Sequence, residues 1–245
     1  MQKDNKIKLS DKTWLFWDRF CWLTDLDYIS RSGLVLLGYF NDVPSIIPVK
    51  DRPESVGEHI RGVISMTFLF QCIFKVGSDS EDEAKYQYDT ELLHEVGERV
   101  ITDIPDDGSR NMEEKDKIEL GLMREFASGL VAPAEARIVS DFMNFQKCDS
   151  FAFLMDKFHF VMKQLYLCSK GLVGYMSEKY AKGLLSRQDE VFMDLTDSDL
   201  AVINTAAHFL CRTRGIPGRE YCIEVMEEGF LQVFGAVPAA LEQFY

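Results

Sequence analysis

Residues 53–75 have the sequence PESVGEHIRGVISMTFLFQCIFK, in which a helix-capping pattern leads into a long apolar run. Ser55 followed three positions later by Glu58 is a capping box, because each side chain can bond to the backbone N–H of the other residue. The apolar residues after it predict a helix that continues to about Lys75. His59 lies in the first turns of this helix, in a segment whose composition indicates burial.

Apolar residues also recur at spacings of three and four along most of the chain, as is typical of helices with one buried face. The acidic segment GSDSEDEAKYQYD, residues 77–89, predicts instead an exposed loop and the start of a helix. Strand patterns are scarce, so the predicted fold is all-α. Further helices are expected at 13–29, 89–101, 112–130, after Pro133, at 149–168, 173–185 and 197–213, and in a last segment ending near Phe234.

Composition limits the classes of function. The chain has 245 residues and a formal charge of −13, and such a negative surface repels the phosphate backbone of nucleic acid polymers. The first residues are too polar for a signal peptide, and no apolar run is long enough to span a membrane. The six cysteines contain no CxxC pair. We therefore expect a soluble cytoplasmic protein that does not bind nucleic acid polymers, and this charge does not exclude a small phosphate ester held in a local basic pocket.

A second histidine lies beside acidic residues, in the stretch LHEVGE at 93–98. On a helical wheel Glu98 lies about 40° from His94 and Glu95 about 100° from it, so the three share one sector. Imidazole nitrogen and carboxylate oxygen are ligands for divalent transition metals, and His59 offers a second imidazole. The pattern indicates a metal site. Spacing alone also allows two ordinary hydrogen-bonded histidines and two solvated glutamates.

Several motifs together carry a resemblance to a known family. The chain resembles the HD-domain phosphohydrolases, and within them the bacterial 5'-deoxynucleotidase branch and its eukaryotic relatives. The resemblance covers roughly residues 14–168 and implies a helical bundle with additional C-terminal helices. The matching pieces are Arg31-Ser32-Gly33, PESVGEH at 53–59, LHEVGE at 93–98, TDIP at 102–105 and MDKF at 155–158.

The resemblance implies a role for particular residues. One divalent transition metal would be held by His59, His94, Glu95 and Asp156. Glu98 would be the catalytic acid/base, Asp103 would contact the sugar, and Arg31 would hold the phosphate. The substrate would be a nucleoside 5'-monophosphate, and no membrane takes part. The metal could be manganese, cobalt, iron, zinc or nickel, since all suit these ligands, and a homodimer is one open oligomeric state.

The chain departs from the family at the defining His-Asp pair, where it has His94-Glu95. The longer carboxylate must reach a metal from a shifted position. A second departure lies near Arg31, where the family carries a bulky tryptophan and this chain has the small residues Ser32 and Gly33. Asp149 lies two helical turns before Asp156 and is an alternative ligand. His159 and His208 are interpreted as structural residues, and Glu54 and Glu58 as first-turn acids stabilised by the helix dipole.

Other functions stay open beside the hydrolase. A catalytically impaired regulatory protein of the same fold would bind metal or nucleotide without turnover. A two-iron oxygenase would call for more histidine ligands than the four histidines provide, and a purely structural helical protein would bind no metal. The predicted organisation is an HD-domain core at 1–170, with a C-terminal helical extension at 171–245 packed on it.

Overall fold

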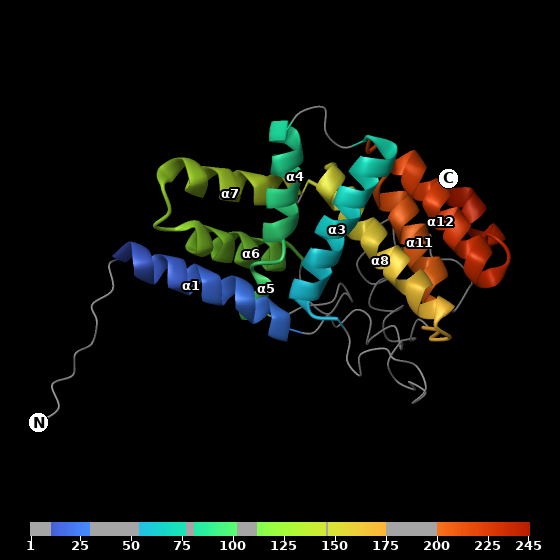
Figure 1. Cartoon of the computed structure of the whole chain (residues 1–245), viewed down its shortest axis with the longest axis horizontal. Coiled ribbons are helices and arrows are strands. Elements are labelled where there is room, and N and C mark those ends of the chain that lie inside the picture. The colour runs from blue at the N-terminus through green and yellow to red at the C-terminus, as the bar shows by residue number, and fades with distance from the viewer. Residues whose placement is uncertain (1–10, 30–53, 77–80, 102–111, 146, 175–199) are drawn as a thin grey trace, which may run out of the picture.

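The computed structural model describes residues 11–29, 54–76, 81–101, 112–145, 147–174 and 200–245. These residues form α-helices and two short 3-10 helices and contain no β-strand, so the all-α prediction is confirmed (Figure 1). The elements are α1 Asp11–Asp25, η1 Leu26–Tyr28, α3 Val56–Phe74, α4 Glu81–Leu93, α5 Glu98–Ile101, α6 Met112–Ala127, α7 Ala132–Phe145, α8 Phe151–Ser169, α11 Ala201–Arg212, α12 Arg219–Phe234 and η2 Ala239–Phe244.

Helix α3 begins as the capping box predicts. Ser55 Oγ accepts a hydrogen bond from the Glu58 backbone N–H at 3.1 Å, and the Ser55 N–H donates to Glu58 Oε2 at 2.9 Å. The helix ends before Lys75, whose φ of 56° is left-handed. The cap matters for the site because it fixes the first turn of α3, where His59 is buried.

The structure corrects two predictions between residues 77 and 101. The segment expected as loop is helical from Glu81, since most of its residues favour helix over an exposed loop. The helix expected at 89–101 is interrupted, because α4 ends at Leu93 and a turn at 94–97 precedes α5. In the turn, the Val96 N–H bonds to Leu93 O and the Glu98 N–H to Glu95 O, each three residues back. His94 and Glu95 therefore lie in a tight turn and not on a continuous helix face.

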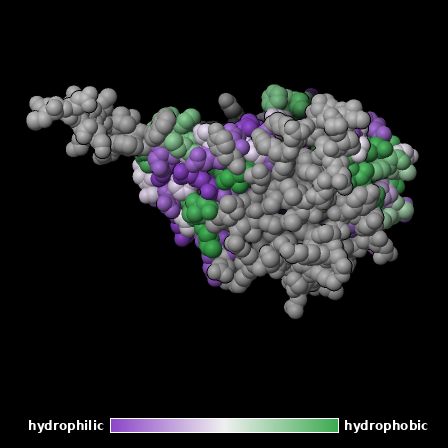
Figure 2. Space-filling view, turned by 90° about the horizontal axis from the view of Figure 1, so that it is seen from below, coloured by the Kyte–Doolittle hydropathy of each residue, from purple (hydrophilic) through white to green (hydrophobic). Residues whose placement is uncertain are grey.

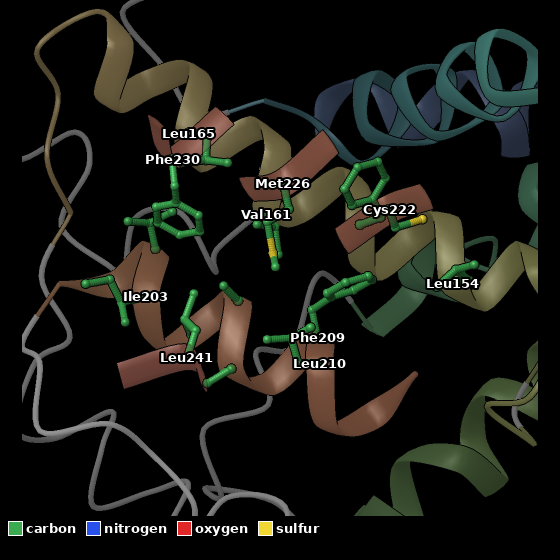
Figure 3. Packing of buried hydrophobic residues seen from close by; sticks show 14 of the residues in the cluster. Leu154, Val161, Leu165, Ile203, Phe209, Leu210, Cys222, Met226, Phe230 and Leu241 are labelled. Carbon is green, nitrogen blue, oxygen red and sulfur yellow. The ribbon is translucent and has the colours of Figure 1, made fainter. Parts of the chain in front are cut away.

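Two hydrophobic clusters form the interior, and α3 contributes to both. The smaller cluster joins α1, η1, the start of α3 and the end of α4 to α6 and α7, with Trp22, Ile60, Met123, Phe126 and Phe142 among its buried members. The larger one joins α3, through Val63 and Phe70, to α8, α11, α12 and η2. Figure 3 shows Val161 and Leu165 of α8 among side chains from α11, α12 and η2. His59 is adjacent to Ile60, between the two clusters.

The C-terminal helices pack on α8, whose buried residues belong to the larger cluster together with theirs. Whether residues 171–245 are a unit separate from 1–170 stays a prediction, and the helix expected at 173–185 lies outside the described residues. None of the helices in the described ranges is long and apolar enough to cross a bilayer. On the face seen from below, the coloured surface at the left mixes hydrophobic and hydrophilic residues (Figure 2).

Candidate metal centre

Three parts of the chain bring the predicted ligands together. His59 comes from the first turn of α3, His94 and Glu95 from the turn after α4, and Asp156 from the first half of α8. One nitrogen or carboxylate oxygen from each of the four lies within 4.8 Å of the others. His59, His94 and Asp156 are buried, while the Glu95 side chain is 13% exposed. The centre therefore has a closed interior and one accessible edge.

The distances show nitrogen and oxygen atoms converging on one space. His59 Nε2 lies 2.8 Å from Asp156 Oδ1, and His94 Nε2 lies 3.7 Å from the same oxygen. Glu95 Oε1 is 3.5 Å from His94 Nε2 and 4.0 Å from His59 Nε2. Only the first of these is a good hydrogen-bond distance. The others are typical of atoms that face a common centre without bonding to one another.

The two nitrogens of His94 have different surroundings. Nδ1 lies 2.6 Å from the backbone oxygen of Glu91, so this nitrogen carries a proton and donates it. Nε2 is buried and has no hydrogen-bond partner among the described residues. When the imidazole is neutral, this tautomer directs the Nε2 lone pair toward Glu95 and Asp156. A buried Nε2 without a hydrogen-bond partner beside two carboxylates fits a divalent metal, and this is the observation that supports a metal here.

The electrostatics of the centre favour a cation. Burial alone would lower the pKa of His94, but polar contact with Asp156 and Glu95 and their charges raise it to about 10. Burial likewise would raise the pKa of Asp156, yet Lys157, His59 and His94 hold it well below its ordinary value. Lys157 Nζ lies 2.7 Å from Asp156 Oδ2. Asp156 is therefore ionised, and a bound metal would replace the proton that this negative field draws to His94.

Charged and polar groups lie around Nδ1 of His59, the nitrogen that faces away from the four candidate ligands. Its Nδ1 lies 3.2 Å from His159 Nδ1 and 3.5 Å from Glu54 Oε1. Glu54 Oε2 in turn lies 2.7 Å from Lys163 Nζ. Burial would raise the pKa of Glu54, but the hydrogen bond with His59 and nearby positive charges hold it well below its usual value. Burial and the neighbouring His59 lower the pKa of His159 to about 3, so this imidazole is neutral.

The sequence does not predict that these three residues form a group. It favours a first-turn acid stabilised by the helix dipole for Glu54 and a structural role for His159, and it gives no signal for Lys163 alone. One signal was available, because Asp156, His159 and Lys163 follow one another at spacings of three and four within an apolar helix. Such a polar stripe on a buried helix indicates a shared polar site. Its contact with residues before α3 could not be obtained from spacing.

The remaining site residues have different outcomes. Glu98 is the first residue of α5 and is 2% exposed. Burial would lower the pKa of Lys115, but the charges of Glu119, Glu95 and Glu98 raise it, so a cation from α6 lies close to the two acids of this turn. Asp149 is exposed and belongs to no group of potential ligands, which favours Asp156. Arg31 and Asp103 lie outside the described residues.

Comparison with known proteins supports the fold. No protein-family model matches the sequence, and no curated protein matches it. The structure is similar to that of a conserved hypothetical protein from Pyrococcus furiosus, with a TM-score of 0.51 and 18% identity, over 87% of this chain and 98% of that chain. It is also similar to the PH0347 protein from Pyrococcus horikoshii OT3, with a TM-score of 0.53 and 15% identity, over 87% of this chain and 97% of that chain.

Proposed function

We propose that the chain is a metal-dependent phosphohydrolase of the HD-domain type that removes phosphate from a small phosphomonoester. The observation that carries this proposal is the cluster of His59, His94, Glu95 and Asp156, in which His94 Nε2 is buried with no hydrogen-bond partner in the part of the chain that the structure describes. The motif resemblance supports a nucleoside or deoxynucleoside 5'-monophosphate as the substrate of this proposal. The products would be the nucleoside and inorganic phosphate, with one water consumed.

A divalent metal at this cluster would supply a Lewis acid and lower the pKa of a water molecule in the site. The protein supplies the remaining chemistry. Glu98 is a buried carboxyl group at the start of α5, three residues after Glu95, and it would take a proton from the attacking water and return one to the leaving oxygen. Lys115 lies near both acids and would offset the negative charge of the phosphate.

Metal content and phosphate release, measured on the same samples, test this proposal. Wild type, His94→Ala and Glu98→Gln would be loaded with manganese, cobalt or zinc and assayed with ribonucleoside and deoxynucleoside monophosphates. We expect stoichiometric metal in wild type, loss of metal and turnover in His94→Ala, and metal without turnover in Glu98→Gln. His208→Ala is the matched control, because His208 belongs to neither group of potential ligands and this variant should keep both. Wild type that binds no metal would overturn the proposal.

A second candidate is a regulatory protein that binds metal or nucleotide without hydrolysing it. The observation that favours it is Glu95, which stands where the family has aspartate and whose Oε1 is 4.0 Å from His59 Nε2. A loosely held fourth ligand would weaken metal binding and would leave the metal less firmly positioned for catalysis. Stoichiometric metal and saturable nucleotide binding in wild type, with no phosphate released, would select this candidate over the hydrolase.

A further inference from the structure

The Nδ1 side of His59 has a built environment that none of the assigned roles explains. His59 is fully buried, and its Nε2 faces the metal cluster through Asp156. The opposite nitrogen faces His159 and Glu54. Both groups come from outside the four potential metal ligands, one from α8 and one from the residue before the α3 cap.

We infer that Glu54, His159 and Lys163 are positioning residues that hold a proton on His59 Nδ1 and thereby keep His59 Nε2 available to the metal. This inference rests on the proposed metal centre and extends it to residues that do not touch the metal. A histidine binds a metal through an unprotonated nitrogen, so its second nitrogen carries the proton and needs an acceptor. Carboxylates and neighbouring polar groups that accept this proton fix the tautomer and the ring orientation.

The geometry provides the acceptors. The two Nδ1 atoms of His59 and His159 are 3.2 Å apart, so one of them must donate to the other. Glu54 Oε1, at 3.5 Å, adds a negative charge on the same side. A proton on His59 Nδ1 satisfies both neighbours. The opposite tautomer places the proton on Nε2, where ionised Asp156 accepts it at 2.8 Å, and leaves an unprotonated nitrogen facing Glu54. A bound metal would replace this Nε2 proton, and the groups on the Nδ1 side would then hold the remaining proton.

Lys163 holds the Glu54 carboxylate in place. Its ammonium group lies 2.7 Å from Oε2, the oxygen that does not face His59. The Glu54 side chain is 7% exposed and that of Lys163 is 31% exposed, so the pair is partly shielded from water. With Oε2 fixed by Lys163, Oε1 has one orientation left, toward the imidazole.

Gly62 makes room for His159. A Cβ at position 62 would lie 2.3 Å from His159 Nε2, closer than any side chain tolerates. The missing side chain lets the imidazole of α8 lie against the α3 backbone, one turn from His59. The arrangement therefore depends on a close approach of two helices as well as on charge.

The same residues could instead hold a second metal, since Glu54, His59 and His159 each offer an atom within 4.8 Å of the others. Two features favour the positioning role. Lys163 already neutralises Glu54 and would repel a second cation. His59 would also have to give up its Nδ1 proton to bind metals through both nitrogens. The number of metal ions per chain distinguishes the two arrangements.

The test is calorimetric titration of the metal-free full chain with zinc, cobalt and manganese. Glu54→Gln should raise the metal Kd by about 10- to 100-fold, the usual effect of removing a group that orients a metal-binding histidine. Lys163→Met should raise it less, and the double variant should resemble Glu54→Gln alone, because Lys163 acts through Glu54. The control is Glu58→Gln, which changes an acid in the first turn of α3 and preserves the capping box. The metal Kd of this variant should stay within about twofold of the wild-type value.

Nuclear magnetic resonance of the zinc-loaded protein gives a readout that a merely structural role would not affect. Long-range 1H–15N spectra should show His59 protonated at Nδ1 in wild type, with a shifted Nδ1 signal in Glu54→Gln. An unchanged Kd in Glu54→Gln, or two bound metal ions per chain in wild type, would overturn the inference. If wild type binds metal as expected but releases no phosphate from any substrate, the hydrolase proposal fails and the positioning role stands. Wild type without metal overturns both.

Discussion

Glu91 is a fully buried residue of α4 whose carboxyl group lies against α3, beside the candidate metal centre. Thr67 Oγ1 donates a hydrogen bond to its Oε1 at 2.5 Å, while Oε2 is buried with no hydrogen-bond partner among the described residues. Burial raises the pKa of Glu91 from 4.5 to about 8; Thr67 and His94 act against this shift, and Asp156 adds to it. Glu91 is therefore protonated at neutral pH and keeps a negative charge out of the contact between the two helices.

Glu91→Gln should remove a pH dependence of stability. Between pH 4.5 and about 8 the folded state holds this proton and the unfolded state does not, so the wild-type free energy of unfolding falls as pH rises. The slope from this group is at most about 1.4 kcal/mol per pH unit. Glutamine has nearly the same shape and does not titrate. Both proteins would be unfolded with urea at pH 5.5, 7 and 8.5, with metal chelated. The free energy of unfolding of the variant should increase relative to that of wild type as pH rises. Parallel profiles would contradict this account of Glu91.

Some residues of the candidate site could be predicted from the sequence, and others could not. His59, His94, Glu95 and Asp156 lie in local motifs, and the structure brings all four together. Glu54 lies only five residues before His59, but the groups of α8 that hold Glu54 and approach His59, Lys163 and His159, depend on where α8 passes α3, and no local pattern carries that information. The unpartnered state of His94 Nε2 is likewise a property of the folded turn. Motifs can identify candidate ligands, whereas the groups that orient them come from tertiary packing.

Among the elements, the turn at 94–97 departs most from what the sequence predicted. A continuous helix would place Glu98 one turn beyond His94 on the same face, and periodicity alone favoured that arrangement. The turn breaks the helix at the two ligands and starts α5 at Glu98. Gly97 lies against α6 here, since a Cβ at this position would be 3.4 Å from Glu119 Cγ. Packing of α6 on the turn accompanies the interruption, and no propensity scale includes such a contact.

The approach of α8 to α3 gives a prediction for Gly62→Ala. The new Cβ would lie 2.3 Å from His159 Nε2, so the imidazole must move and lose its contact with His59. We expect metal affinity to fall by about tenfold, as when other groups that orient a metal-binding histidine are lost. Overpacking should also cost about 1–3 kcal/mol of stability, more than alanine gains in helix propensity.

Gly121→Ala is the matched control for this change. Gly121 lies in α6, and an added Cβ there would meet nothing within 4 Å. This substitution should stabilise the protein by about 0.5–1 kcal/mol and leave the metal Kd unchanged. Calorimetric titration and urea unfolding of both variants provide the measurements. Equal metal affinity in the two variants would show that His159 can shift without effect on His59.

On the scale of the whole molecule, α8 connects the candidate metal centre to the larger hydrophobic cluster. It carries Asp156 in its first half and packs with α11 and α12 along its length. The all-α class and most helices were predictable, because periodicity is a local property. The division of the interior into two clusters that share α3 was not, since it depends on which helix faces meet. The similar solved structures share this helical fold over 87% of the chain.

This arrangement predicts that metal stabilises helices that do not contact it. Metal at about 100 times its Kd should add about 2.7 kcal/mol to the free energy of unfolding. Buried amides of α11 and α12 that exchange through global unfolding should then exchange about 100-fold more slowly, and His94→Ala should show no such change. Hydrogen exchange followed by mass spectrometry measures this. Slower exchange confined to α3, α4 and the start of α8 would show that the two clusters unfold independently.

The wide spacing of the ligands along the chain has a consequence for biosynthesis. His59 and Asp156 are in direct contact although 97 residues separate them. When α3, α4 and the turn after α4 have emerged from the ribosome, three of the four candidate ligands are present without the fourth, and α8 then needs α11 and α12 to complete the larger hydrophobic cluster. Domains generally fold as units during synthesis at about 5–20 residues per second. A metal held by these four residues would consequently be acquired late, after the ribosome has made α8, α11 and α12.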